Sequence, residues 1–301
     1  RVAALLQTVT GRDVKMEGTD EMPFSVDTSL RDTTAAGLLK NTTADAATTV
    51  KRAHAFGLEM KNVSVDVQAS DGRAQCNVKG TVNRGKLDVQ PVLRVKEGRP
   101  VVVVPKEHTV VSGFHLQKGP LMRMLSRAMP LFRNAVQPEG LIDVTVKKAR
   151  MGLGSDAAKN ASGAAQVNLR NVTLNASSVL RPVIQFAGLP QTGIKIPDQE
   201  ISLSLEKGAI HQSKMNLNVS GRELHLSGRV GLDKSLNLEV ALPITRKMVG
   251  SEAVFRLLGQ RRVTAGIRGT LDNPRLQRDV LRENLRRLMP DTPFGLFERG
   301  Q

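Results

Sequence analysis

The sequence contains no tryptophan and no tyrosine, and its only cysteine is Cys76. Proteins that bind single-stranded nucleic acid use aromatic side chains as stacking platforms, so this composition disfavours that function. A single cysteine forms no internal disulfide and supplies too few ligands for a structural zinc site of the usual kind. The composition therefore points away from nucleic acid, disulfides and zinc.

Long apolar runs are also missing. The longest run of valine, leucine and isoleucine extends from Val101 to Val104, whereas a membrane-spanning helix needs about 20 apolar residues. The chain begins at Arg1 without a methionine, and we expect it to be a fragment, so the absence of an anchor from this sequence does not mean absence from the parent protein.

Basic residues are in excess along the whole chain. The formal net charge is +16 at pH 7, and both halves contribute to it, so the excess is not a basic tail. A field of this sign favours acidic partners such as anionic lipid, acidic glycan or nucleic acid. It carries no information about the fold.

Period-two alternation of aliphatic and polar residues dominates the sequence and predicts β-strands. The clearest block spans residues 201–242, where turn residues separate the runs at Lys207-Gly208, Gly221-Arg222 and Asp233-Lys234. This block predicts an antiparallel meander with one aliphatic face and one polar face.

A second block, residues 58–104, has the same alternation. We expect strands near residues 58–69, 74–82, 86–95 and 100–104, with turns at Asp71-Gly72, Arg84-Gly85 and Glu97-Gly98. Shorter strands are expected over residues 141–147 and 166–174, and a polar loop over residues 155–163.

Four stretches have the spacing of amphipathic helices: residues 120–136, 178–188, 246–259 and 275–289. Pro120 fits the first turn of the first helix, and Pro130 should kink it. The predicted fold class is α+β: a β-rich, curved antiparallel meander sheet with about four amphipathic helices packed on or beside it. Residues 30–55, rich in threonine and alanine, receive no assignment.

The stretch "GTVNRGKL", residues 80–87, contains G-x-x-x-x-G-K. A phosphate-binding P-loop needs Ser or Thr after the lysine to ligate magnesium, and a helix that starts there. Leu87 occupies that position instead, and another alternating strand follows. We therefore predict a hairpin turn at Asn83-Arg84-Gly85 and no bound nucleotide.

Other sequence motifs are present in part, but the residues around them do not fit the function that each motif indicates. Residues 152–157 fit G-x-G-x-x-A, but no amphipathic helix follows, so we expect a loop instead of a dinucleotide site. No histidine lies at metal-ligand spacing from another histidine or from the cysteine, and His225 is expected to be solvated on a strand's polar face. Because no catalytic constellation emerges, we predict a non-enzymatic protein with no metal and no cofactor.

The last predicted helix, residues 275–289, is rich in arginine. Its leucines predict packing against the sheet with the arginines in water, and an anionic membrane surface is the alternative partner for the same charges. The anionic-surface candidates are Arg275, Arg278, Arg282, Arg286 and Arg287.

One decapeptide occurs twice in similar form. Residues 78–87 read "VKGTVNRGKL" and residues 267–276 read "IRGTLDNPRL". Repetition of a strand and a turn indicates a repetitive sheet, since a ligand loop would occur once. We expect Gly80→Val to damage the fold, because a glycine inside a strand marks a bend or a close approach. Lys86→Ala should leave any activity almost untouched.

The second copy lies in "RVTAGIRGTLDNPRL", which follows "LSGRVGLDKSLNLEVALPIT" and precedes an expected helix. This arrangement resembles the C-terminal region of AsmA-like envelope proteins, where a strand ending in Gly-Thr-Leu-x-Asn-Pro closes the sheet before a final helix. The stretch "RAMPLFRNAVQPEGLIDVTV", residues 127–146, resembles planctomycete-type members. The resemblance covers residues 115–290 and implies a relation to bridge-like lipid-transfer proteins, whose curved sheet forms a hydrophobic groove.

The resemblance divides the chain into an N-terminal β-rich segment, residues 1–115, and an AsmA-like C-terminal region, residues 116–301, in one continuous sheet. It implies a periplasmic protein, anchored to the inner membrane by a segment outside this chain, that binds or conducts phospholipid between membranes without catalysis. The alternative is a structural or assembly factor that contacts other envelope proteins. Nucleic acid is disfavoured as a partner.

An aliphatic sheet face suits an acyl chain, because removing the chain from water recovers about 0.8 kcal/mol per CH₂. The amphipathic helices could instead cover this face as an ordinary core, and periodicity shows only that the face is buried. The sequence leaves the open groove and the filled core as equal alternatives. The lipid-facing candidates are Leu203, Leu205, Leu217, Val219, Leu224, Leu226, Val230, Leu236, Leu238 and Val240.

Overall fold

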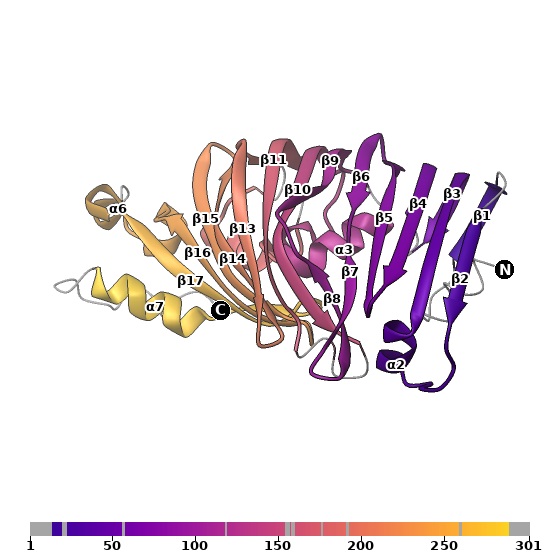
Figure 1. The fold of residues 1–301 in the computed structure, drawn as a ribbon. Helices are drawn as coiled ribbons and strands as arrows, with labels where there is room; N and C mark the ends of the chain where they lie inside the picture. The colour runs from indigo at the N-terminus through magenta and orange to yellow at the C-terminus, as the bar shows by residue number, and fades with distance from the viewer. Residues whose placement is uncertain are drawn as a thin grey trace. The chain divides into compact units, whose positions relative to one another are not determined.

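A computed structural model describes residues 14–19, 23–55, 58–117, 119–153, 157, 160–175, 177–190, 193–258 and 261–288. Strands account for 59% of the described residues and helices for 17%, and the strands pair in antiparallel fashion (Figure 1). This confirms the predicted β-rich α+β class. Among the described helices, none is both long enough and apolar enough to span a bilayer.

Contacts group the chain into two compact units that interleave along the sequence. Unit 1 comprises residues 1–121, 141–168 and 202–208, and unit 2 comprises residues 122–140, 169–201 and 209–301. The linear division expected at residue 115 stays a prediction.

Unit 1 consists mainly of antiparallel hairpins. The helix α2 (Ala35–Lys40) begins where the Thr34 hydroxyl accepts a hydrogen bond from the Gly37 amide, and it lies with β3 in the stretch that the sequence left unassigned. The strands are β1 (Val14–Thr19), β2 (Phe24–Thr28), β3 (Thr42–Ala55), β4 (Leu58–Ser70), β5 (Arg73–Val82), β6 (Gly85–Val89), β7 (Val92–Lys96), β8 (Arg99–Val104), β9 (His108–His115), most of β10 (Glu139–Gly152) and the first part of β11 (Ser162–Leu174).

Two-residue turns set the register of these hairpins. Positive φ angles at both central residues indicate type I′ turns, which fit the twist of the strands, at Asp71-Gly72, Asn83-Arg84 and Glu97-Gly98. Val82 pairs with Gly85, so the stretch that resembles a phosphate loop is a hairpin, as predicted. A Cβ on Gly85 would lie 2.8 Å from the Phe114 backbone, and this close approach to β9 explains the glycine.

Some strand boundaries differ from the predicted ones. The strand expected over residues 86–95 is interrupted, because Pro91 lies between β6 and β7 and has no N–H for the ladder. Strands β10 and β11 extend beyond the expected residues 141–147 and 166–174, and β11 includes the end of the predicted polar loop. Their additional residues are mostly small or charged, so they do not continue the aliphatic alternation.

Unit 2 contains most of the meander that was predicted over residues 201–242. The expected helix over residues 120–136 ends before Pro130, and the helix expected over residues 246–259 is divided at Gly250, whose φ is +65°. The helices are α3 (Pro120–Ala128), the 3₁₀ helix η1 (Pro130–Phe132), α4 (Arg181–Ala187), α5 (Arg246–Val249), α6 (Glu252–Leu258) and α7 (Arg278–Arg287). The strands are the end of β11, β12 (Ile194–Ile196), the start of β13 (Gln199–Glu206), β14 (Ala209–Val219), β15 (Arg222–Gly231), β16 (Ser235–Pro243), β17 (Arg262–Thr270) and β18 (Pro274–Leu276).

Both copies of the repeated decapeptide form hairpins, but with different turns. In unit 1, Val78 pairs with Val89 around the turn at Asn83-Arg84. In unit 2, Ile267 pairs with Leu276 around residues 270–273. The sequence thus predicts the strand and turn correctly in both copies, although it does not predict the difference in register.

The aliphatic face of β14–β17 is the core of unit 2. Met215 pairs with Leu226, Leu226 with Val240, and Val240 with Ala265, and all four side chains are 0% exposed. Helix α7 lies against β17 (Figure 1). Burial of the α7 leucines therefore closes this part of the core.

Candidate functional site

Most of the predicted lipid-facing side chains lie in the closed core of unit 2. Eight of the ten are at most 4% exposed: Leu217, Val219, Leu224, Leu226, Val230, Leu236, Leu238 and Val240. A ligand could reach these eight only if the core opened. Leu203 and Leu205, on the part of β13 that belongs to unit 1, are half-buried.

Unit 1 presents a different aliphatic face. Cross-strand neighbours share one side of a sheet, and Val65 pairs with Val78, which in turn pairs with Val89. Val67 pairs with Cys76 in the next row. All these side chains are only half-buried, although their sequence alternation matches that of unit 2.

The half-buried face continues toward β8 and β9, whereas toward β3 it meets a buried cluster of Val50, Ala53 and Val63. Leu87 lies opposite Gly80 and pairs with Val111 on β9, and Leu93 pairs with Val102 on β8. Each of these four aliphatic side chains is half-buried. We call the set Val65, Val67, Cys76, Val78, Leu87, Val89 and Leu93 the unit 1 aliphatic face.

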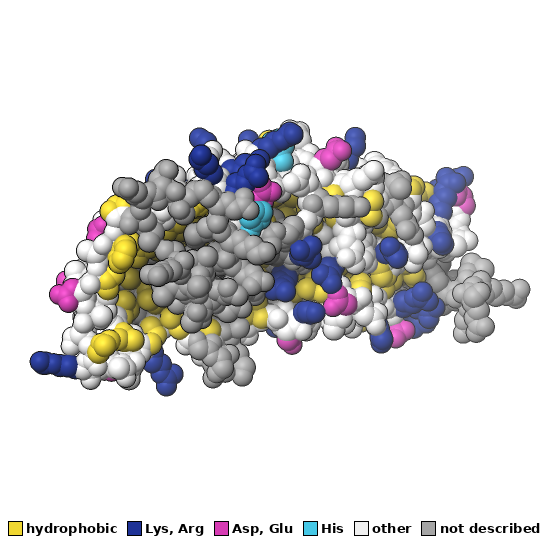
Figure 2. Space-filling model, turned by 90° about the vertical axis from the view of Figure 1, so that its right-hand side faces the viewer, with side chains coloured by type: hydrophobic (Ala, Val, Ile, Leu, Met, Phe, Trp, Pro, Cys, Tyr) yellow, Lys and Arg dark blue, Asp and Glu magenta, His cyan; other side chains and the backbone are white. Residues whose placement is uncertain are grey.

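Exposed hydrophobic side chains also occur near the N-terminal strands. Phe24, Val26 and Leu30 are 67%, 58% and 71% exposed. Figure 2 faces this side and shows hydrophobic side chains at the surface between groups of lysine and arginine. Apolar and basic groups are therefore neighbours on the surface in this view.

Cys76 provides a chemical reporter on the unit 1 aliphatic face. Burial raises the pKa of its thiol, and the negative charge of Asp66 adds to the increase. A raised pKa reduces the thiolate fraction and slows alkylation at neutral pH. Its reactivity should consequently respond to whatever covers the face.

The arginines of α7 remain in solvent while the helix packs by its leucines. Leu281 and Leu285 are buried, and the side-chain amide of Asn284 donates to the Thr264 carbonyl over 2.9 Å. The five anionic-surface candidates are all exposed: Arg278, Arg282, Arg286 and Arg287 on α7, and Arg275 on β18, outside the helix that was predicted to begin at residue 275. Packing and a basic outer surface thus coexist on one helix.

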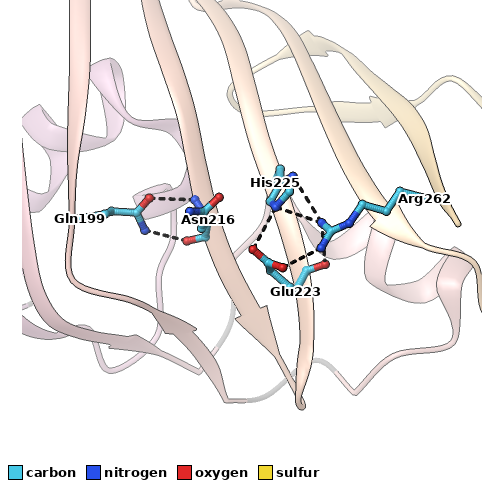
Figure 3. Close-up of polar contacts among 5 residues, drawn as sticks. All are labelled: Gln199, Asn216, Glu223, His225 and Arg262. Atoms are coloured by element: carbon cyan, nitrogen blue, oxygen red, sulfur yellow. Dashed lines mark hydrogen bonds and ion pairs between the residues drawn. The ribbon is translucent and has the colours of Figure 1, made fainter. Parts of the chain in front are cut away.

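A polar cluster lies on the outer face of the unit 2 meander (Figure 3). Arg262 Nη2 donates to Glu223 Oε2 over 2.6 Å, and Glu223 Oε1 lies 3.0 Å from His225 Nε2. Hydrogen bonding to His225, and then to Arg262, lowers the pKa of Glu223. His225, expected to be solvated, instead has a carboxylate and a guanidinium partner.

The cluster connects strands that are not neighbours in the sheet. Arg262 on β17 reaches Glu223 and His225 on β15 across the intervening β16. Beside it, Gln199 Nε2 donates to the Asn216 carbonyl and its Oε1 accepts from the Asn216 amide, each over 2.8 Å (Figure 3). This side chain continues the β12–β14 ladder beyond the Lys195–Asn218 pair.

Among the described residues, no group of three or more His, Cys, Asp and Glu side chains is placed to hold a metal ion. Comparisons with protein-family models, curated proteins and solved structures yield no match to this chain. The resemblance to AsmA-like proteins stays a prediction.

Sequence reasoning did not distinguish the two aliphatic faces. The candidates came from the strongest alternation, residues 201–242, and this is also the region with the most complete core. The signal that favours unit 1 was present in composition: its face has four valines, one cysteine and two leucines, whereas five of the eight buried candidates in unit 2 are leucines. Small side chains leave a face less completely covered.

Proposed function

We propose that this chain is a non-enzymatic lipid-binding protein of the cell envelope, which holds a phospholipid acyl chain on the unit 1 aliphatic face. The observation that carries the proposal is the incomplete burial of Val65, Val67, Val78, Leu87 and Val89 on one side of β4–β6. Apolar surface that stays partly in water gains free energy when hydrocarbon covers it.

The face has suitable chemistry and length for a hydrocarbon chain. From Ala74 to Gly80 along β5, six steps of about 3.3 Å give a path of about 20 Å. The hydrocarbon of one leaflet is about 15 Å thick, half of a bilayer core. Each CH₂ that leaves water contributes about 0.8 kcal/mol, and no aromatic ring interrupts the face.

The charge of the chain suits an anionic headgroup and an anionic membrane. The net charge is +16, and the α7 arginines are exposed. We propose that the protein works in the periplasm at the surface of the inner membrane, in keeping with its resemblance to AsmA-like proteins. Electrostatic attraction of this kind is worth about 1 kcal/mol per basic residue near the surface.

A structural or assembly role is the second candidate. For unit 2, the closed core favours a structural or assembly role, because eight of the predicted lipid-facing side chains have no access to a ligand. In that role the α7 arginines would contact another envelope protein. Unit 1 would then bind no lipid at all.

Alkylation of Cys76 tests the lipid proposal. The rate of N-ethylmaleimide addition is measured with and without phosphatidylglycerol vesicles. Occupancy of the face should slow the reaction about tenfold, because the thiol reacts only when accessible and ionised. An unchanged rate, together with no lipid in an organic extract of the purified protein, would contradict the proposal.

The matched control moves the thiol to the other side of the sheet. In a Cys76→Ser, Gln68→Cys variant, the cysteine lies on β4 at an exposed position whose cross-strand partner is Gln75. Vesicles should leave its alkylation rate unchanged. Equal slowing at both positions would indicate general shielding at a vesicle surface instead of occupancy of the aliphatic face.

A further inference from the structure

The polar side of unit 1 contains an opening in the sheet. Pairing between β7 and β8 ends at Val92 and Val103, and pairing between β6 and β9 resumes only at Leu87 and Val111. Residues 88–91 and 104–110 between these points share no ladder pairs in the described register. Pro91 and Pro105 lie within the two segments, and neither has an N–H with which to close the gap.

A cavity occupies this opening. Its volume is about 280 Å³, and it is lined by both broken segments together with Arg73 and Gln75 of β5. A second cavity of about 420 Å³ adjoins it along the polar side, lined by Asp66, Asn77 and Lys79, and the two share Gln75 and Gln90. The pair approaches the size of small-molecule sites, about 300–1,000 Å³.

Side-chain amides and carboxylates converge on the opening. Gln90 Nε2 donates to Asp88 Oδ1 over 3.0 Å, and Lys79 Nζ lies 3.7 Å from Asp88 Oδ2. On the neighbouring strands, Gln75 Nε2 donates to Asn77 Oδ1 over 3.5 Å, and Asn77 Nδ2 donates to Asp66 Oδ1 over 3.3 Å. The two carboxylates, Asp66 and Asp88, therefore each accept a hydrogen bond from a side-chain amide, which fixes their position.

One buried polar atom at the opening lacks a hydrogen bond. His108 Nε2 lies 3.2 Å from Asp88 Oδ1, close enough for an ion pair, but its alignment is outside the range for a hydrogen bond. Among the described residues it has no other partner. The contact is therefore poorly aligned, and a ligand hydroxyl or a water that bridges His108 and Asp88 would give both side chains a well-aligned hydrogen bond.

The side chains around the opening include hydrogen-bond donors, hydrogen-bond acceptors and charges of both signs. Each side-chain amide has one acceptor oxygen and two N–H donors, so the Oε1 atoms of Gln75 and Gln90 remain available after the bonds described above. Arg73, Lys106 and Glu107 line the first cavity. Lys79 and Asp66 line the second, and Asp88 lies 3.7 Å from Lys79. Balanced charges select no ion, whereas alternating donors and acceptors match hydroxyl groups, which both donate and accept.

We propose that this opening binds an uncharged, hydroxyl-rich ligand of about one sugar ring. His108 Nε2, Gln75 and Gln90 would contact its hydroxyl groups, and Lys79 and Asp88 would orient the amides. Since the chain has no Trp or Tyr to stack on a sugar face, affinity should be in the millimolar range. The site lies on the side of β5 opposite Cys76 and is independent of the proposed acyl site, because adjacent residues of a strand face opposite ways.

Saturation-transfer NMR with D-glucose, D-mannose and N-acetyl-D-glucosamine tests the proposal. We expect transfer from the protein to at least one of these sugars, and shifts of the Gln75 and Gln90 side-chain amide resonances. The double variant Gln75→Leu, Gln90→Leu should weaken binding about tenfold, as expected for lost hydrogen bonds. The control Gln68→Leu makes the same change on the same side of the sheet but lines neither cavity, and it should bind normally.

Two outcomes would overturn the proposal: no transfer to any of the three sugars, or equal transfer in the double variant and the wild type. Shifts of the same amides by inorganic phosphate, without an effect of sugar, would also overturn it in favour of an anion site. The backbone amide spectrum verifies that the double variant folds. Its Cys76 should keep the response to phosphatidylglycerol vesicles, which separates failure of this proposal from failure of the lipid proposal.

Discussion

The sheet faces of unit 1 and unit 2 share the same alternation of aliphatic and polar residues but differ in burial. Leu226 and Val240 in unit 2 are 0% exposed, whereas Val67 and Val78 in unit 1 are half-buried. Alternation therefore identifies which face of a strand is apolar but not what covers it. The covering depends on helices and neighbouring segments that alternation within a strand does not specify.

Truncation of one side chain on each face gives the largest expected difference. Leu226→Ala should lower the free energy of unfolding by about 3–4 kcal/mol, because it leaves a cavity in a filled core. Val67→Ala should cost about 1 kcal/mol, because the side chain is already partly hydrated. Urea unfolding measures both values, and equal losses would contradict the difference in burial.

The repeated glycines provide a second comparison. Gly269 has φ +105°, and a Cβ there would lie 2.5 Å from the Asn273 carbonyl oxygen. Gly269→Val should therefore cost about 3 kcal/mol through backbone strain. Gly80 has no such φ, and its Cβ would lie 3.2 Å from Val63 Cγ2, so Gly80→Val should cost about 1–2 kcal/mol through crowding.

Thermal unfolding of the two glycine variants ranks these effects. Alanine at the same positions serves as the control, since it adds the Cβ without the larger side chain. A larger loss for Gly80→Val than for Gly269→Val would contradict the roles given to these two strand glycines.

A buried glutamine predicts a stabilising substitution in unit 2. Gln212 is 5% exposed, and both its amide atoms are without a hydrogen-bond partner among the described residues. Gln212→Met keeps the approximate shape and removes the desolvated amide, so it should raise the free energy of unfolding by about 1 kcal/mol. The control Gln68→Met, at an exposed position in unit 1, should change stability little. A less stable Gln212→Met protein would contradict the view that the Gln212 amide is destabilising in the core.

The smallest expected effect is a dependence of stability on pH at Glu223. Its pKa is lowered from 4.5 in the folded protein, so its stabilising contribution is present above pH 4.5 and is lost as the pH falls through the lowered value. Glu223→Gln should flatten the acid limb of the stability profile. Glu239→Gln, at an exposed position on neighbouring β16, is the matched control and should leave that limb unchanged.

Much of the fold follows from local signals in the sequence. Alternation and turn residues locate the hairpins because Asp71-Gly72 and Glu97-Gly98 adopt positive φ at low cost. Pro130 was expected to kink the helix over residues 120–136, but the α-helix ends at Ala128, before this proline. The interruption at Pro91 was not predicted, although a proline inside an expected strand is a local signal that could have revealed it.

The candidate sites were harder to predict because they depend on contacts distant in sequence. The opening beside Asp88 and His108 exists only because two broken strands lie next to each other. Likewise, Arg262 reaches His225 across an intervening strand, and no spacing in the sequence reveals this. Burial of the aliphatic faces is also a tertiary property, which explains why the lipid-facing candidates fell mainly in a closed core.

Photocrosslinking with a diazirine-bearing fatty acid tests the central claim most directly, because it compares both faces in a single sample. The account predicts labelled peptides from residues 65–93 of unit 1 and none from residues 217–240 of unit 2. Excess unlabelled oleate should compete with the labelling. Labelling confined to residues 217–240, or absent from both regions, would contradict the assignment of the acyl site to unit 1.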